Sequence, residues 1–180
     1  MIPAIHDATH TKEFCGSINT EDAIVIKCAP VFGKPENECF PIVEEYITSH
    51  GGELVIGWAI WERPKVFIEA EFHAVWRSDS GECIDIVTRN PSHERITFLP
   101  DPNRKYTGLQ VDNIRKPLIK DKDVIRYLFL FKRMYEVMNT GDLANQHGMI
   151  ALPERLMREY MKLAKEAKVL HHRLEKRYPD

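Results

Sequence analysis

The segment Phe67-Ile68-Glu69-Ala70-Glu71-Phe72-His73-Ala74-Val75-Trp76 alternates two kinds of side chain and predicts a β-strand with one apolar face. The residues of one parity are all apolar: Val66, Ile68, Ala70, Phe72, Ala74 and Trp76. The other parity sets His73 beside the carboxylates of Glu69 and Glu71. We therefore expect His73 to point away from the apolar core.

A turn follows this strand and predicts a β-hairpin. Residues 78–81, Ser-Asp-Ser-Gly, have turn composition, and residues 82–87 form a second extended segment. A three-residue loop at 78–80 would set Arg77 opposite Gly81 and, in the same register, His73 opposite Asp85. The carboxylate could then accept the imidazole N–H and fix the tautomer of the ring. A two-residue loop would destroy this pairing, because side chains alternate between the two faces of a strand.

A cysteine stands at the predicted start of a helix upstream of this hairpin. Asn37 is the expected N-cap, Cys39 lies in the first turn, and Gly51-Gly52 ends the helix. The positive end of the helix dipole, together with a nearby imidazolium, favours the thiolate, which is the reactive form. The backbone N–H of Cys39 could donate to an oxyanion, with the Asn37 side chain as a second donor.

This order of a thiol on a helix, an imidazole on a strand and a carboxylate on the next strand resembles the transglutaminase-like branch of the papain-like cysteine hydrolases. His-Ala-Val-Trp at 73–76 resembles the His-Ala-aromatic strand of that family, and Ile-Asp-Ile-Val-Thr at 84–88 resembles its Asp-containing strand. The resemblance covers residues 37 to 88. The chain departs from the family pattern in three ways: no Gly precedes Cys39, no Pro follows Asp85, and the strand expected at 54–61 has no family signature.

The resemblance implies a catalytic triad of Cys39 as nucleophile, His73 as general base and acid, and Asp85 as the orienting carboxylate. The implied activity is that of a cysteine-dependent acyl hydrolase or transferase: an amidase, peptidase, deamidase or transglutaminase-like enzyme. Its substrate would be a protein, a peptide or a small amide, and Glu69 and Glu71 could line the substrate cleft. No cofactor is expected.

The same residues allow two other interpretations. In a non-enzymatic protein-binding domain, or in a degenerate member of the same fold, Cys39 is a packed apolar side chain, and Glu69, Glu71 and His73 grip a partner. Metal binding is the third chemistry, and its possible ligands are Cys39, His73, Cys83, Asp85, Glu69 and Glu71. We place it lower, because the chain contains no Cys-x-x-Cys or His-Glu-x-x-His motif.

Length and composition limit the remaining possibilities. A chain of 180 residues is expected to form one domain, with a catalytic-like α+β core at 1–121 and a helical C-terminal extension at 122–180. The net charge of −2 gives no electrostatic reason to expect nucleic acid or membrane as a partner. The four irregularly spaced cysteines do not suggest a disulfide scaffold, and the N-terminus has no signal-peptide pattern, so a cytoplasmic location is expected.

The remaining pattern predicts an α+β fold with a central antiparallel sheet, an N-terminal helix that bears the nucleophile, and a C-terminal helical pair. Strands are expected at 23–28, 54–61, 66–77, 82–87 and 95–99, and a long surface connection at 100–121. Apolar residues recur with helical spacing from Val124 to Met138 and from Leu156 to Leu174. These two helices could also mediate self-association, and basic residues outnumber acidic ones in the second.

Overall fold

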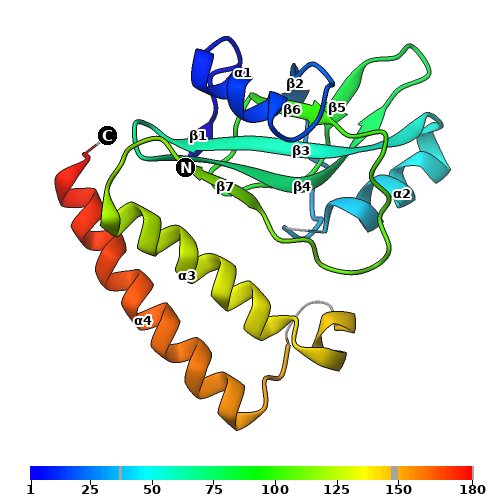
Figure 1. Ribbon diagram of the computed structural model, residues 1–180. Helices are drawn as coiled ribbons and strands as arrows, with labels where there is room; N and C mark the ends of the chain where they lie inside the picture. The colour runs from blue at the N-terminus through cyan, green and yellow to red at the C-terminus, as the bar shows by residue number, and fades with distance from the viewer. Residues whose placement is uncertain (37, 147–149, 180) are drawn as a thin grey trace. The chain divides into compact units, whose positions relative to one another are not determined.

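The computed structural model describes residues 1–36, 38–146 and 150–179 and has an α+β architecture (Figure 1). The strands are β1 (Ile2–Pro3), β2 (Ile24–Cys28), β3 (Glu53–Arg63), β4 (Phe67–Arg77), β5 (Cys83–Asp85), β6 (Arg95–Pro100) and β7 (Ile114–Pro117). The helices are α1 (Thr9–Gly16), α2 (Cys39–His50), α3 (Lys122–Met138) and α4 (Glu154–Arg177), with a short 3-10 helix at Gly141–Asn145. The chain forms two compact units. The first comprises Met1–Glu62 and Ile68–Lys105, and the second comprises Arg63–Phe67 and Tyr106–Asp180.

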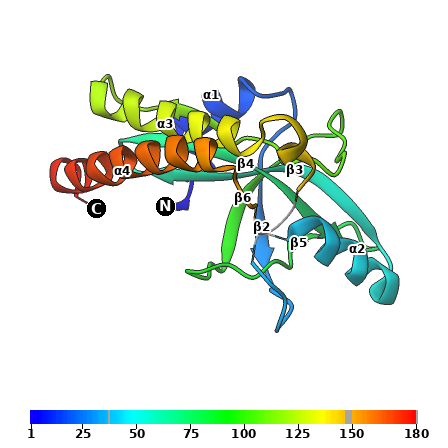
Figure 2. The ribbon, with the colours of Figure 1, turned by 90° about the horizontal axis from the view of Figure 1, so that it is seen from below.

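A closed barrel forms the centre of the first unit. The strand order of the sheet is β1-β3-β6-β2-β5-β4-β7, and an additional pairing of β3 with β4 closes five of these strands into a ring. The pairs β3–β6, β2–β6 and β4–β5 are antiparallel, but β2 and β5 run parallel, side by side in Figures 1 and 2. The sheet is therefore mixed, which corrects the prediction of a central antiparallel sheet. The parallel pair joins segments that are distant in the sequence, and hairpin patterns carry no information about such a pairing.

Closure of the barrel buries both faces of β4. Ile68, Ala70 and Ala74 are fully buried, as expected, but His73 is only 1% exposed. Val75, on the same face as His73, belongs to an apolar cluster with Trp61 and Phe98. The prediction that His73 lies on a polar face away from the core is therefore wrong, because the alternating pattern of one strand does not show what covers its second face.

The hairpin between β4 and β5 forms in a register two residues from the predicted one. The backbone N–H of Ser78 donates to the carbonyl of Glu82 (2.9 Å), so the loop is 79–81 rather than 78–80. Arg77 pairs with Cys83, not with Gly81. A slip of two residues preserves the alternation of faces. His73 and Asp85 therefore share a face as diagonal neighbours instead of lying directly opposite each other.

Helix α2 begins at Cys39, so this residue occupies the first turn as predicted. Glu38 takes the N-cap position, without a capping hydrogen bond from its side chain, and the predicted N-cap Asn37 lies outside the described residues. Gly51 follows the helix with a φ of 69°, a left-handed conformation that favours glycine. The helix therefore ends at the predicted Gly51-Gly52 pair.

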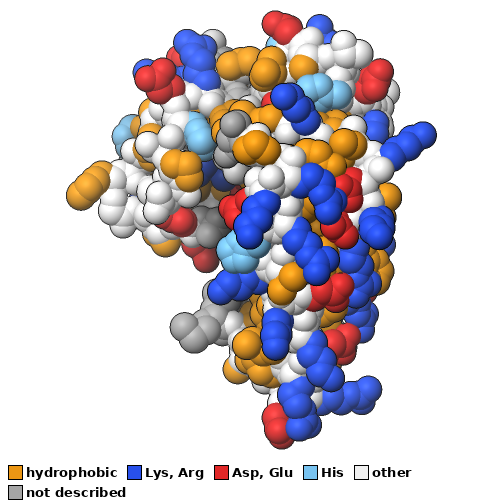
Figure 3. Space-filling model, turned by 90° about the vertical axis from the view of Figure 1, so that its left-hand side faces the viewer, with side chains coloured by type: hydrophobic (Ala, Val, Ile, Leu, Met, Phe, Trp, Pro, Cys, Tyr) orange, Lys and Arg blue, Asp and Glu red, His pale blue; other side chains and the backbone are white. Residues whose placement is uncertain are grey.

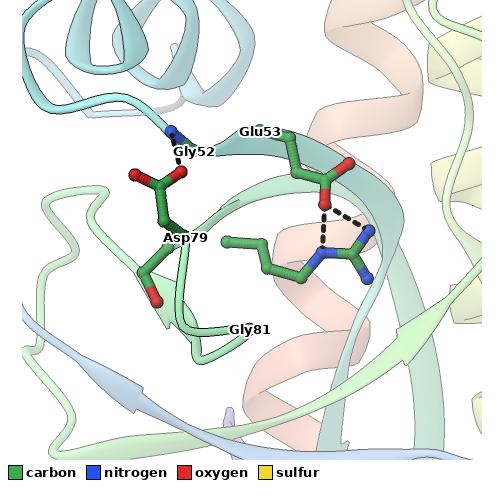
Figure 4. Close-up of a pocket in the computed structure, with 6 residues that line it drawn as sticks. Gly52, Glu53, Asp79 and Gly81 are labelled. Atoms are coloured by element: carbon green, nitrogen blue, oxygen red, sulfur yellow. Dashed lines mark hydrogen bonds and ion pairs between the residues drawn. The ribbon is translucent and has the colours of Figure 1, made fainter.

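The turn of the β4–β5 hairpin holds the C-terminal end of α2 (Figure 4). Asp79 accepts a hydrogen bond from the backbone N–H of Gly52 (3.1 Å). The indole of Trp76 donates to the carbonyl of Gly51 (2.9 Å). The Arg77 guanidinium donates to Glu53 (2.7 Å). Both residues line a surface depression of about 480 Å³, together with Gly52, Asp79 and Gly81. These contacts tie the helix that carries Cys39 to the hairpin that carries His73 and Asp85.

Gly52 is the residue at which this connection is most sensitive to substitution. An added Cβ would lie 2.3 Å from the carbonyl oxygen of Arg77 and 2.7 Å from Nε1 of Trp76, at a φ of +81°. We expect Gly52→Ala to lower the free energy of unfolding by about 2–4 kcal/mol, as measured by urea denaturation. Gly16→Ala is the matched control, since nothing lies within 4 Å of its added Cβ. Equal stability of Gly52→Ala and Gly16→Ala would show that the close packing at Gly52 does not stabilise the connection between α2 and the hairpin.

The second unit contains the predicted helical pair. Leu128 and Leu130 of α3 and Leu170 and Leu174 of α4 are buried in one apolar cluster. The side chain of Asp121 caps α3 by accepting a hydrogen bond from the backbone N–H of Asp123 (2.7 Å). The prediction of two amphipathic helices is therefore confirmed.

Ion pairs join α3 to α4 and leave much of the basic charge of α4 exposed. Arg126 donates to Glu166 (2.7 Å) and Arg133 donates to Glu159 (2.6 Å) across the pair. Figure 3 shows Lys and Arg side chains along one face of the molecule. Self-association through these helices stays a prediction.

Within the described part of the chain, no helix is both long enough and apolar enough to cross a membrane.

Candidate active site

The structure brings Cys39, His73 and Asp85 together in the first unit. Nε2 of His73 lies 3.1 Å from Oδ1 of Asp85, and both side chains are buried. The side chain of Cys39 lies close enough to the His73 ring to help raise the pKa of that ring. The predicted contact between imidazole and carboxylate is confirmed, and the catalytic role of the three residues stays a prediction.

Each member of this group is positioned by a different element. Cys39 is the first residue of α2, His73 lies in the middle of β4, and Asp85 is the last residue of β5. Asp85 is held in place by the parallel pairing of β5 with β2, in which it lies beside Cys28. The three side chains therefore meet because the barrel closes, although 46 residues separate the first from the last.

Both carboxylate oxygens of Asp85 have polar partners. It is fully buried, and Oδ1 accepts from the backbone N–H of Val87 (3.1 Å) as well as facing His73. Oδ2 accepts from Nε of Arg89 (3.3 Å). Burial alone would raise the pKa of Asp85, but the charge and hydrogen bond of His73, the charge of Arg89 and the Val87 N–H together lower it. Asp85 is therefore a carboxylate, able to orient the imidazole and to stabilise its protonated form.

The environment of His73 favours the imidazolium. Burial lowers the pKa of this histidine, but the charge and hydrogen bond of Asp85, aided by the Cys39 side chain, outweigh burial and raise it to about 10. Nε2 faces Asp85, so a proton transfer of the triad kind would take place at Nδ1.

Arg89 belongs to this cluster and was not among the predicted site residues. Its Nη1 donates to Oε2 of Glu71 (2.9 Å), and its guanidinium carbon lies 4.7 Å from the ring centre of Trp61. Its Nη2 lies 3.3 Å from Nε2 and 3.4 Å from Nδ1 of His73. The partners of Arg89 come from β3, β4 and β5, so no local sequence pattern could have revealed it.

The other predicted site residues have different surroundings. Glu71 lies in the cluster, where it accepts from Arg89 and from the indole N–H of Trp61 (2.7 Å), so its oxygens are bonded to the protein itself. Glu69 is half-buried on β4. Asn37, predicted as a second oxyanion donor, lies outside the described residues.

The three other cysteines are in environments that disfavour a thiolate. Burial raises the pKa of Cys15 to about 11. The pKa of Cys28 also rises to about 11, through burial and then through the charge of Asp85. Burial raises the pKa of Cys83 as well. The reactivity of a thiolate is therefore not expected at these three positions.

The described residues contain no group of three or more His, Cys, Asp and Glu side chains arranged to hold a metal ion.

Comparison of the chain with models of protein families, with curated proteins and with solved structures gives no match. The chemistry of the site is therefore inferred from its own geometry.

Proposed function

We propose that this protein is a cysteine-dependent acyl hydrolase or transferase of the transglutaminase-like kind, with Cys39, His73 and Asp85 as its catalytic triad. The observation that carries the proposal is the buried contact between His73 and Asp85, with the Cys39 side chain close enough to raise the pKa of the same imidazole. The position of Cys39 in the first turn of α2 also supports it, because the helix dipole there favours a thiolate.

The first half of the reaction forms a thioester. The thiol proton moves to Nδ1 of His73, and the Cys39 sulfur attacks the carbonyl carbon of an amide or ester. The resulting oxyanion can accept a hydrogen bond from the backbone N–H of Cys39, since N–H groups in the first turn have no helical acceptor. When the carbon–nitrogen or carbon–oxygen bond breaks, the leaving group takes the proton from His73.

The second half releases the acyl group. His73, now neutral, accepts a proton from water or from an amine as that nucleophile attacks the thioester carbon, and Cys39 leaves as the thiolate. Water completes hydrolysis or deamidation, and an amine completes transamidation. Asp85 holds the ring in the required tautomer throughout. The proposed substrate class is a protein, a peptide or a small amide.

A degenerate member of the same fold, with a binding role, is the second candidate. The observation that favours it is the burial of Cys39, whose side chain is 8% exposed. With this little exposure, the sulfur is accessible to a narrow acyl group at most, or to no substrate.

Selective alkylation tests the proposal. We expect iodoacetamide to modify Cys39 near neutral pH at least 10-fold faster than the three other cysteines, because their pKa values are raised by burial. Peptide mass spectrometry of a time course measures all four rates in one sample. A Cys39→Ser variant, which should lose the fast phase, is the control. Absence of modification at Cys39 in the folded protein would support the degenerate fold instead.

A further inference from the structure

Arg89 shares the Asp85 carboxylate with His73. His73 faces Oδ1 (3.1 Å) and Arg89 donates to Oδ2 (3.3 Å), so the two side chains share one buried anion. The side chain of Arg89 is 16% exposed and Asp85 is fully buried, so solvent contributes little to this contact. An anion that is divided in this way stabilises the imidazolium less than one that His73 holds alone.

The guanidinium also approaches the imidazole itself. Nη2 lies at nearly equal distances from the two ring nitrogens, 3.3 Å and 3.4 Å, and each nitrogen of an imidazolium would carry a proton. Two cations at this separation repel each other. Stacking on Trp61 (4.7 Å) and the bond to Glu71 (2.9 Å) hold the guanidinium beside the ring.

The charged and titratable groups around His73 come from several elements. Asp85 of β5 and Cys39 of α2 face the ring directly and favour its protonated form. Cys28 of β2 lies close enough to Asp85 and Arg89 to respond to both charges. His93, in the segment before β6, responds to the charge of Arg89, and its pKa is lowered by burial and by that cation. Arg89 is the permanently charged cation in this set, with its Nη2 3.3 Å from Nε2 of His73.

We infer that Arg89 is a positioning residue, which fixes Asp85 and Glu71 around the triad and opposes protonation of His73 so that the imidazole can release its proton to a leaving group. This inference rests on the proposed function, in which His73 must alternate between its two protonation states. Without Arg89, the thiolate–imidazolium pair would be too stable for the proton to leave readily.

The test measures the titration of His73 by NMR in the intact protein, with the ring signal assigned from its loss in His73→Gln. We expect Arg89→Gln to raise the pKa of His73 by about one unit or more, and Arg89→Lys, which keeps the charge, to change it much less. Arg77→Gln is the matched control, because it removes an arginine of the same hairpin whose guanidinium is bonded to Glu53 of β3 and not to a member of the triad. Melting temperatures show whether each variant is folded, and Arg89→Met, which also removes the charge, serves if Arg89→Gln is not folded.

Rates of Cys39 alkylation in the same variants separate this inference from the proposed function. Fast, selective labelling of the native protein with an unchanged His73 pKa in Arg89→Gln would overturn the role of Arg89 and leave the proposed function intact. A raised His73 pKa in a protein whose Cys39 is inert would support the electrostatic role of Arg89 and overturn the proposed function. An equal shift in Arg77→Gln would also overturn the inference, since the effect would then be one of net charge.

Discussion

Replacement of His73 by glutamine should slow the alkylation of Cys39 by roughly 30-fold at pH 7, because an unassisted thiol is only a few per cent ionised there. The substitution removes the group that accepts the thiol proton and the cation that stabilises the thiolate. Glutamine still offers an N–H to Asp85, so the buried carboxylate keeps a donor. The measurement is the pseudo-first-order rate with iodoacetamide at several pH values.

His172→Gln is the control for this variant, since His172 lies on α4 in the second unit and its contact is with Glu175. It should leave the rate at Cys39 unchanged. Unaltered labelling in His73→Gln, with a native melting temperature, would show that His73 does not activate the thiol and would remove the triad as an explanation of the site.

The second large effect is expected for Asp85→Asn, in both stability and reactivity. The substitution leaves Arg89 with only Glu71 as its anionic partner and leaves His73 without its counter-charge. We expect the free energy of unfolding to fall by about 3–5 kcal/mol, the usual cost of removing one partner of a buried ion pair. Cys39 alkylation should slow in parallel, because the imidazolium is no longer stabilised. A destabilised variant whose Cys39 reacts at the native rate would assign Asp85 a purely structural role.

The pH dependence of stability provides a separate test of the same pair. The lowered pKa of Asp85 means that its contribution is complete above the ordinary value of 3.8 and is lost as the pH falls through the native value. The raised pKa of His73 means that its contribution is complete below 6.5 and is lost as the pH rises toward 10. The stability difference between the native protein and Asp85→Asn should therefore be largest near pH 5 and smaller near pH 9.5. Urea denaturation at the two pH values measures it, and a constant difference would exclude this charge coupling.

Local sequence patterns determined much of the secondary structure around the site. Alternation with a period of two located β4, short extended apolar segments located β3 and β6, and the Gly51-Gly52 pair located the end of α2. The same alternation placed His73 and Asp85 on one face, and it did so despite the wrong register, since a two-residue slip leaves faces unchanged. Helical spacing located α3 and α4 because each buries an apolar stripe. The short elements α1, β1 and β7 were not predicted, since two to eight residues carry too little periodicity.

Other features of the site depended on contacts between segments that are distant in the sequence. The parallel pairing of β2 with β5 and the burial of His73 follow from closure of the barrel, which no single strand encodes. Arg89 is part of the site because β3, β4 and β5 supply its partners. The sequence by itself therefore determined which face carries the imidazole and the carboxylate, since side-chain direction is a local property of the backbone. Only the tertiary structure decided that this face is buried and which cation shares it, because burial and charge pairing depend on what lies across the barrel.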